Sequence, residues 1–170
     1  EMLYSIRSDT DELLLAKEDD LRSSAYLISF ADKELLSIIS EQSISSKSMD
    51  ILQLALQNKE IRENFLVAGV KYVRDEDRDG IAQSADYLLK REGIDTVVVY
   101  GIVGGSVIDG SLRTMSRTLD PDKWLKELFG TSSEGKFYGG GRHDKGGFQV
   151  PLGIFKYCPD EDMLWNVVKD

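Results

Sequence analysis

The residues of this chain with the clearest chemical potential lie together between Tyr138 and Phe148. Five of these eleven residues are glycine, and Arg142, His143 and Lys145 can each carry a positive charge. Glycine lets a backbone approach a ligand closely, and cationic side chains donate charge-assisted hydrogen bonds to anions. The stretch therefore favours the binding of a phosphate or a carboxylate. Composition alone leaves a mobile surface loop as an equal alternative.

A second polar group lies upstream, on a segment with the alternation of a strand. Ile108 and Leu112 fall on one face, which places Asp109, Ser111 and Arg113 on the other. The planar guanidinium of Arg113 can hold two oxygens of a phosphate. Its plainer interpretation is a surface ion pair with a neighbour such as Asp109.

Three further candidates also have two interpretations each. His143 is the one histidine of the chain; it suggests a catalytic base, but a solvated loop histidine fits as well. Asp9 is either a metal ligand or the N-cap of a helix. The acidic run 75–79 favours a solvated approach to a helix over a metal cage, because acidic residues are favourable at a helix N-terminus.

Composition limits the classes of function. The net charge of -9 and the pI near 4.7 argue against a protein that coats duplex DNA, although a local basic pocket remains open. The single cysteine, Cys158, excludes an internal disulfide and a thiolate zinc cluster. Because no apolar run is long enough for a bilayer and no signal peptide is recognisable, we expect a cytoplasmic protein without membrane contact. The chain opens with Glu1, so we expect a piece of a longer protein.

The elements that must position these residues can be predicted from periodicity. Helical repeats occupy residues 19–30, 32–39 and 48–58, with Asp32 and Ser48 as N-caps. Residues 65–73 and 96–103 predict strands, separated by an amphipathic helix that ends at Gly93. We therefore expect an α/β fold, in which a helical N-terminal portion precedes a mixed β-sheet domain with packed helices.

The rest of the chain continues this alternation. Gly104 and Gly105 predict a tight hairpin into the segment 107–115. Asp120 and Pro121 predict the start of a helix that ends at Gly130. Residues 149–155 predict a last strand, followed by a helix capped by Asp160. The buried stripe of the helix after Pro121 is predicted to be Trp124, Leu125 and Leu128.

One motif consists of residues 109–114, followed by Leu119 and Asp120 and then by Phe129 and Gly130; a second consists of residues 139–141 followed by Gly146 and Gly147. In this order the two motifs resemble the DHH-associated domain of the DHH phosphoesterase family. The resemblance spans residues 62–156. The family includes RecJ-type exonucleases, oligoribonucleases that also dephosphorylate phosphoadenosine phosphate, and cyclic-dinucleotide phosphodiesterases. Residues 6–10 resemble the last motif of the family's catalytic domain, in which the aspartate, here Asp9, binds manganese.

The resemblance implies a division of the chain. Residues 1–61 would be the tail of a DHH catalytic domain plus a linker, residues 62–156 the substrate-binding DHH-associated domain, and residues 157–170 a C-terminal helix. It also implies manganese at Asp9. The phosphate contacts that it implies are Ser111, Arg113, Gly139, Gly140, Gly141, Arg142 and His143.

The sequence departs from the family pattern in two ways. The Asp-His-His motif and the earlier aspartates of the two-metal site are absent, and Asp9 alone cannot hold two metal ions. We therefore expect the C-terminal half of a larger enzyme, inactive when isolated from its catalytic domain. Arg142 occupies the position where the family usually has histidine, and His143 is displaced by one, which leaves the role of Arg142 open.

The resulting expectation is the substrate-binding half of a manganese-dependent phosphodiesterase or phosphatase. Its substrate would be a short single-stranded oligonucleotide or a nucleotide phosphate. The alternative is a non-catalytic nucleic-acid-binding module, because this type of domain also resembles the C-terminal region of alanyl-tRNA synthetases. A regulatory or dimerising domain with a vestigial pocket is the third interpretation. The sequence leaves open the exact substrate and the oligomeric state, a homodimer included.

Overall fold

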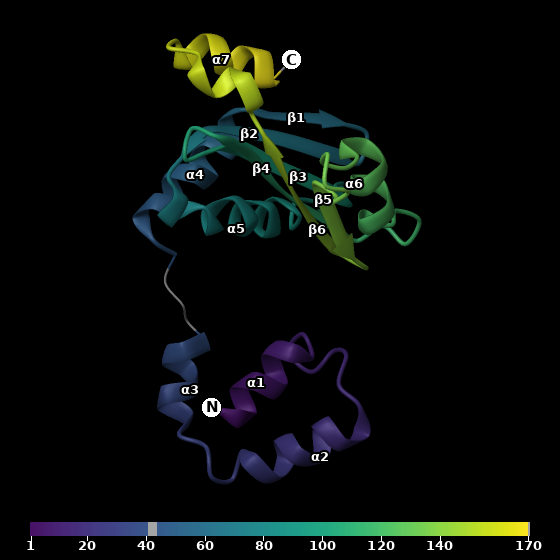
Figure 1. The fold of residues 1–170 in the computed structure, drawn as a ribbon. Coiled ribbons are helices and arrows are strands. Elements are labelled where there is room, and N and C mark those ends of the chain that lie inside the picture. Colours follow the sequence, from purple (N-terminus) through teal and green to yellow (C-terminus); the bar gives the residue numbers. More distant parts are fainter. Residues whose placement is uncertain (41–43, 170) are drawn as a thin grey trace. The chain divides into compact units, whose positions relative to one another are not determined.

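The computed structural model describes residues 1–40 and 44–169, which fall into two compact units, Glu1–Ser43 and Ile44–Asp170. The first unit contains three helices, α1 (Met2–Asp9), α2 (Glu18–Leu27) and α3 (Lys33–Ser40) (Figure 1). Asp32 caps α3 as expected, accepting a hydrogen bond from the Leu35 N–H at 3.0 Å. Asp9 is the last residue of α1, so its interpretation as an N-cap is wrong.

The second unit is built on a six-stranded mixed sheet of order β1-β2-β3-β4-β6-β5. Strands β2 and β3 are parallel and all other neighbours are antiparallel. The structure therefore confirms an α/β fold. The strands are β1 (Lys59–Arg62), β2 (Phe65–Val73), β3 (Thr96–Val103), β4 (Val107–Thr114), β5 (Gly139–Arg142) and β6 (Lys145–Pro151).

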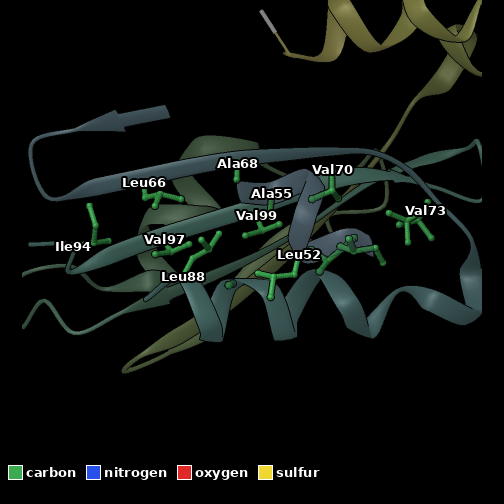
Figure 2. Close-up of a cluster of buried hydrophobic side chains, with 14 residues drawn as sticks. Leu52, Ala55, Leu66, Ala68, Val70, Val73, Leu88, Ile94, Val97 and Val99 are labelled. Carbon is green, nitrogen blue, oxygen red and sulfur yellow. The ribbon is translucent and has the colours of Figure 1, made fainter. Parts of the chain in front are cut away.

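Helices α4 (Ser46–Gln57) and α5 (Asp79–Leu88) cover one face of the sheet. Strand alternation sends Val97 and Val99 to this face, where they pack with Leu52 and Leu88 in the main hydrophobic core (Figure 2). Ser45, rather than Ser48, is the N-cap of α4, and its Oγ accepts from the Ser48 N–H at 3.0 Å. A short 3₁₀ segment, η1 (Asp75–Asp77), precedes α5, so the acidic run is an approach to a helix.

Helices α6 (Pro121–Phe129) and α7 (Glu161–Lys169) pack on the other face. Leu125 is fully buried, and Val98, Leu112 and Phe148 surround it. Asp120 and Gly130 bound α6 as predicted, but Leu128 is exposed and Phe129 takes its place against Phe148. Trp165 of α7 stacks on Tyr100 with ring centroids 5.7 Å apart.

Two predicted boundaries differ from the structure. The compact units divide between residues 43 and 44 rather than at residue 61, because the buried side of α4 belongs to the core of the sheet. The last strand runs from Lys145 to Pro151, and the segment after it is the 3₁₀ helix η2 (Gly153–Tyr157). Over residues 1–40 and 44–169, none of the helices has the length and hydrophobicity needed to cross a bilayer.

The glycine-rich stretch forms a β-hairpin, not a loop. Strands β5 and β6 pair from Gly139 opposite Phe148 to Arg142 opposite Lys145, with His143 and Asp144 as the turn. The turn is attached to the end of β4 by a 2.8 Å hydrogen bond from the Thr114 N–H to the Asp144 carbonyl. The interpretation as a mobile loop is therefore wrong, and the hairpin forms one edge of the sheet.

Candidate functional site

Strands β4, β6 and β5, together with Tyr138 just before β5, bring nine residues into three rows on the face of the sheet that also carries α5. Residues opposite one another on neighbouring strands point to the same face, and Val97, the partner of Arg113 on β3, lies in the core beneath α5. Arg113, Lys145 and Arg142 form the first row, called here the cationic row. The middle row is Ser111, Gly147 and Gly140. The third row is Asp109, Gln149 and Tyr138, with the Gln149 N–H donating to the Tyr138 carbonyl at 2.7 Å.

This part of the sheet, called here the open face, is accessible to a ligand. Gly147 is exposed in the middle of it, whereas Ser111 and Asp109 on β4, against which α5 packs, are buried. A pocket of about 510 Å³ and a second of about 290 Å³ adjoin here, and Arg78, Asp109, Gly110 and Gly147 line both. A flat floor without bulky side chains thus lies between two polar rows.

Arg113 is held firmly at one end of the cationic row. Its Nε donates to Asp86 Oδ1 of α5 at 2.5 Å, and its Nη1 donates to Ser111 Oγ at 2.6 Å. The side chain is only 15% exposed. The ion pair considered from the sequence therefore exists, but its partner is Asp86 and not Asp109. The predicted residues Ser111 and Arg113 are in direct contact.

Arg142 and Lys145 complete the cationic row from the edge strand and its neighbour. Both are exposed, and within the described part of the chain neither lies in an ion pair. Three cations therefore face one carboxylate, that of Asp86. This local positive charge contrasts with the net charge of -9 of the whole chain.

His143 lies apart from these pockets. It projects from the turn of the hairpin and lines a different pocket of about 780 Å³, together with the loop 114–120. The structure therefore brings Ser111, Arg113, Gly140 and Arg142 together around the open face, and places His143 beside it at the strand ends. Contact of His143 with a phosphate stays a prediction.

The glycines of the hairpin serve close packing. A Cβ on Gly146 would lie 2.5 Å from Leu125 Cδ1, and a Cβ on Gly141 would lie 2.5 Å from the Lys145 carbonyl oxygen. None of Gly139, Gly140 and Gly141 has a positive φ, so their backbone conformation does not itself require glycine. The contact of these three glycines with a phosphate stays a prediction, and the contact would be made by the edge strand β5.

Asp122 of α6 occupies one outward donor of that edge. Its Oδ1 accepts from the Gly141 N–H at 3.1 Å, and its Oδ2 pairs with Lys126 Nζ at 2.6 Å. The hydrogen bond from Lys126, followed by that from Gly141, lowers the pKa of Asp122. A carboxylate of the chain itself is thus bound by a backbone N–H of the glycine stretch.

The third row contains an ion pair with a buried carboxylate, which the sequence did not reveal. Arg78 Nη2 lies 2.6 Å from Oδ2 of Asp109, whose side chain is 11% exposed. Burial raises the pKa of Asp109, while the charge and hydrogen bond of Arg78 act in the opposite direction. Gln149, with its amide oxygen turned to Arg78, accepts from Nη1 at 3.2 Å. Alternation along residues 145–151 would have placed Gln149 beside Asp109, but Arg78 lies in a charged run without periodicity.

The predicted metal ligand Asp9 belongs to the other compact unit. It is exposed at the end of α1, and among residues 1–40 and 44–169 no three His, Cys, Asp or Glu side chains gather as a metal site would require. The described residues therefore do not fit a manganese site. Manganese stays a prediction for a longer protein.

Comparison with known proteins supports the fold. No protein-family model matches the chain. The uncharacterized protein MJ1633 of Methanocaldococcus jannaschii is 34% identical over 171 residues, which cover 99% of this chain and 34% of that protein. The chain thus spans about a third of the length of this curated relative.

Among solved structures, an exopolyphosphatase-related protein from Bacteroides fragilis is similar to this chain, with a TM-score of 0.60 and 14% identity. The alignment covers 96% of this chain and 46% of that one. This likeness shows a shared fold. The C-Ala domain of alanyl-tRNA synthetase from Aquifex aeolicus has a TM-score of 0.40 and 17% identity, covering 66% of this chain and 95% of that one.

Proposed function

We propose that this chain is the substrate-binding part of a phosphoesterase of the DHH type, acting on short oligonucleotides or nucleotide phosphates. The observation that carries the proposal is the cationic row beside the flat middle row, in which Gly147 is exposed. Three cations with a single carboxylate partner attract a phosphate group in a chain that is otherwise acidic. The fold shared with an exopolyphosphatase-related protein is consistent with phosphate chemistry.

The chain's own residues would bind and orient the phosphate. Asp86 and Ser111 hold the guanidinium of Arg113 in one orientation, so its position is fixed before a ligand arrives. Arg142 and Lys145, which extend from the hairpin, would reach the remaining phosphate oxygens. Hydrolysis itself would need metal ions held by another part of a longer protein.

The test is an NMR titration of a diadenylate into the chain at low salt. Arg142→Ala combined with Lys145→Ala should weaken binding by about tenfold or more, since a hydrogen bond to a charged group contributes about 1.5–3 kcal/mol. The matched control is Lys59→Ala with Arg62→Ala, which removes the same charges from β1 at the opposite edge of the sheet.

The outcomes separate the candidate functions. An equal loss in both double variants, or no binding by the parent chain, would overturn the proposed site and favour a regulatory or dimerising domain. Tighter binding of a long single strand than of the diadenylate would favour a nucleic-acid-binding module over an enzyme of short substrates.

A further inference from the structure

The pocket of about 510 Å³ lies at the end of the open face away from the cationic row. Asp109 and Gln149 line its floor, Arg78 lies on one side, and Phe137 and Tyr138 of the loop before β5 lie on the other. Arg113 lies four positions after Asp109 along β4, a distance of about 13 Å at 3.3 Å per residue. The pocket therefore adjoins the cationic row without including any of its three residues.

The polar groups at the floor of this pocket carry no net charge as a set. The ion pair with the buried carboxylate of Asp109 compensates the charge of Arg78. What remains for a ligand is the accessible part of the guanidinium, whose side chain is 46% exposed, and the carboxamide of Gln149. Such donors and acceptors match an uncharged polar edge better than a phosphate. Lys136 is the other cation among the lining residues.

Phe137 adds an exposed aromatic surface to the same pocket. Its side chain is 49% exposed, and Lys126 Nζ lies 5.1 Å from the centre of its ring. The loop that carries it is ordered by a bridge between Thr131 and Phe137 and by a 2.8 Å hydrogen bond from the Ser132 N–H to the Lys136 carbonyl. An aromatic ring fixed in this way is a platform on which a planar heterocycle can stack.

We propose that this pocket binds the base of the nucleotide whose phosphate lies on the cationic row. Phe137 stacks on the base, and Arg78 and Gln149 donate hydrogen bonds to acceptors on its edge. Gly147, which is exposed and has no side chain, leaves room for the sugar to cross the middle row. The inference rests on the proposed function, because the phosphate contact is what orients the nucleotide along the open face.

The experiment compares adenosine 5′-monophosphate with ribose 5-phosphate, which has the same phosphate and sugar but no base. We expect the parent chain to bind the nucleotide about tenfold more tightly, within the range that stacking of one base on an aromatic side chain provides. Phe137→Ala should remove this preference and leave the Kd for ribose 5-phosphate unchanged. Phe155→Ala, at a phenylalanine that is 52% exposed on η2 outside the pocket, is the matched control and should change neither Kd.

Gln149→Ala provides a second variant that keeps the Arg78 and Asp109 pair. This variant should weaken the binding of adenosine 5′-monophosphate severalfold without changing the Kd for ribose 5-phosphate. Equal binding of both compounds by the parent chain, or an unchanged preference in Phe137→Ala, would overturn the base pocket alone. Absence of binding of either compound would overturn the proposed function, and the base pocket with it.

Discussion

Arg113 shows how one residue can satisfy two interpretations of a sequence. Its ion pair with Asp86 is the ordinary surface interaction, but the same pair, together with Ser111, aligns the guanidinium with Lys145 and Arg142. A phosphate that reaches the guanidinium must compete with the Asp86 carboxylate, whose side chain is 58% exposed. Asp86 therefore controls how much of Arg113 a ligand can use.

Asp86→Asn should strengthen binding of a diadenylate by about threefold to tenfold. The substitution removes the competing charge while its amide oxygen can still accept from Arg113, and each tenfold change corresponds to about 1.4 kcal/mol. Titration calorimetry at two salt concentrations measures the effect. Glu60→Gln on β1 changes the net charge equally and should leave the affinity almost unchanged. Equal gains in both variants would mean that only overall charge matters.

Substitution of Arg113 itself separates geometry from charge. Arg113→Lys should lose most of the affinity that Arg113→Ala loses, roughly 1.5–3 kcal/mol, because an ammonium group cannot hold Asp86, Ser111 and a phosphate in one plane. The same calorimetric titration tests this. Retention of most of the affinity by the lysine variant would assign Arg113 the role of a simple charge.

At this scale the sequence identified positions but not partners. The strand alternation of residues 107–114 placed Ser111 and Arg113 together on one face, as the structure has them. Asp86, the ion-pair partner of Arg113, lies 27 residues before it in the chain. Arg78, the ion-pair partner of Asp109, lies in a charged run. No local periodicity links residues so far apart, since their contact depends on how α5 packs on the sheet.

The hairpin of β5 and β6 contains two adjacent glycines with different surroundings. Gly146→Ala should destabilise the protein by about 1–3 kcal/mol, because its Cβ would lie 2.5 Å from Leu125 Cδ1 and 3.0 Å from the Gly140 carbonyl oxygen. The nearest atom to a Cβ on Gly147 is the Gly110 carbonyl oxygen at 3.3 Å. Gly147→Ala should therefore destabilise the protein less than Gly146→Ala does, and its main effect should be weaker binding of the nucleotide.

Urea denaturation and nucleotide titration of the two variants measure this difference. A larger loss of stability for Gly147→Ala than for Gly146→Ala would contradict the packing of α6 on the hairpin. Normal nucleotide binding by a folded Gly147→Val variant would show that the ligand does not cross the middle row.

The contact of Asp122 with the hairpin should depend on pH. Lys126 and the Gly141 N–H lower the pKa of Asp122 in the folded protein. Its stabilising contribution is thus fully present above the unfolded pKa of about 3.9 and is lost as the pH falls through the lower folded pKa. The amide proton shift of Gly141 should follow this titration below pH 4, whereas Asp122→Asn should abolish it. A Gly141 shift that titrates equally in both proteins would contradict the contact.

Helices and strands with a strong hydrophobic pattern could be predicted from the sequence, whereas the two edge strands of the sheet could not. Strands β2 and β3 have the predicted bounds, and Asp120 and Gly130 delimit α6. Strand β1 was missed because its four residues are all exposed and three of them are charged. Strand β5 was missed because glycine has low strand propensity, whereas the close approach of Leu125 to Gly139 and of the Lys145 carbonyl oxygen to Gly141 favours glycine at these positions.

At the scale of the molecule, the two compact units differ in their cores. In the described part of Glu1–Ser43, Leu3 is the one buried apolar side chain, whereas Ile44–Asp170 contains three clusters of buried residues. The second unit therefore has the apolar burial that independent folding requires. The candidate site lies entirely within it.

Residues 44–170 expressed alone should unfold cooperatively and retain nucleotide binding. A shorter piece, residues 62–170, follows the boundary that the family resemblance implies and lacks α4 and most of β1. It loses the buried side chains of Ile51, Leu52 and Ala55, and should be destabilised by several kcal/mol or remain unfolded. Thermal melts by circular dichroism compare the two. Equal stability of both pieces would place the boundary at residue 61 after all.

The bond between Asp122 and the Gly141 N–H also bears on how the protein avoids aggregation. A strand at the edge of a sheet presents unpaired backbone groups, on which another chain can add as a further strand. Here a charged side chain already occupies an outward N–H of β5, and an approaching carbonyl would have to displace it together with its Lys126 partner. The carboxylate thus ends the hydrogen-bonded ladder and keeps an accessible, glycine-rich edge from serving as a template for a neighbouring copy.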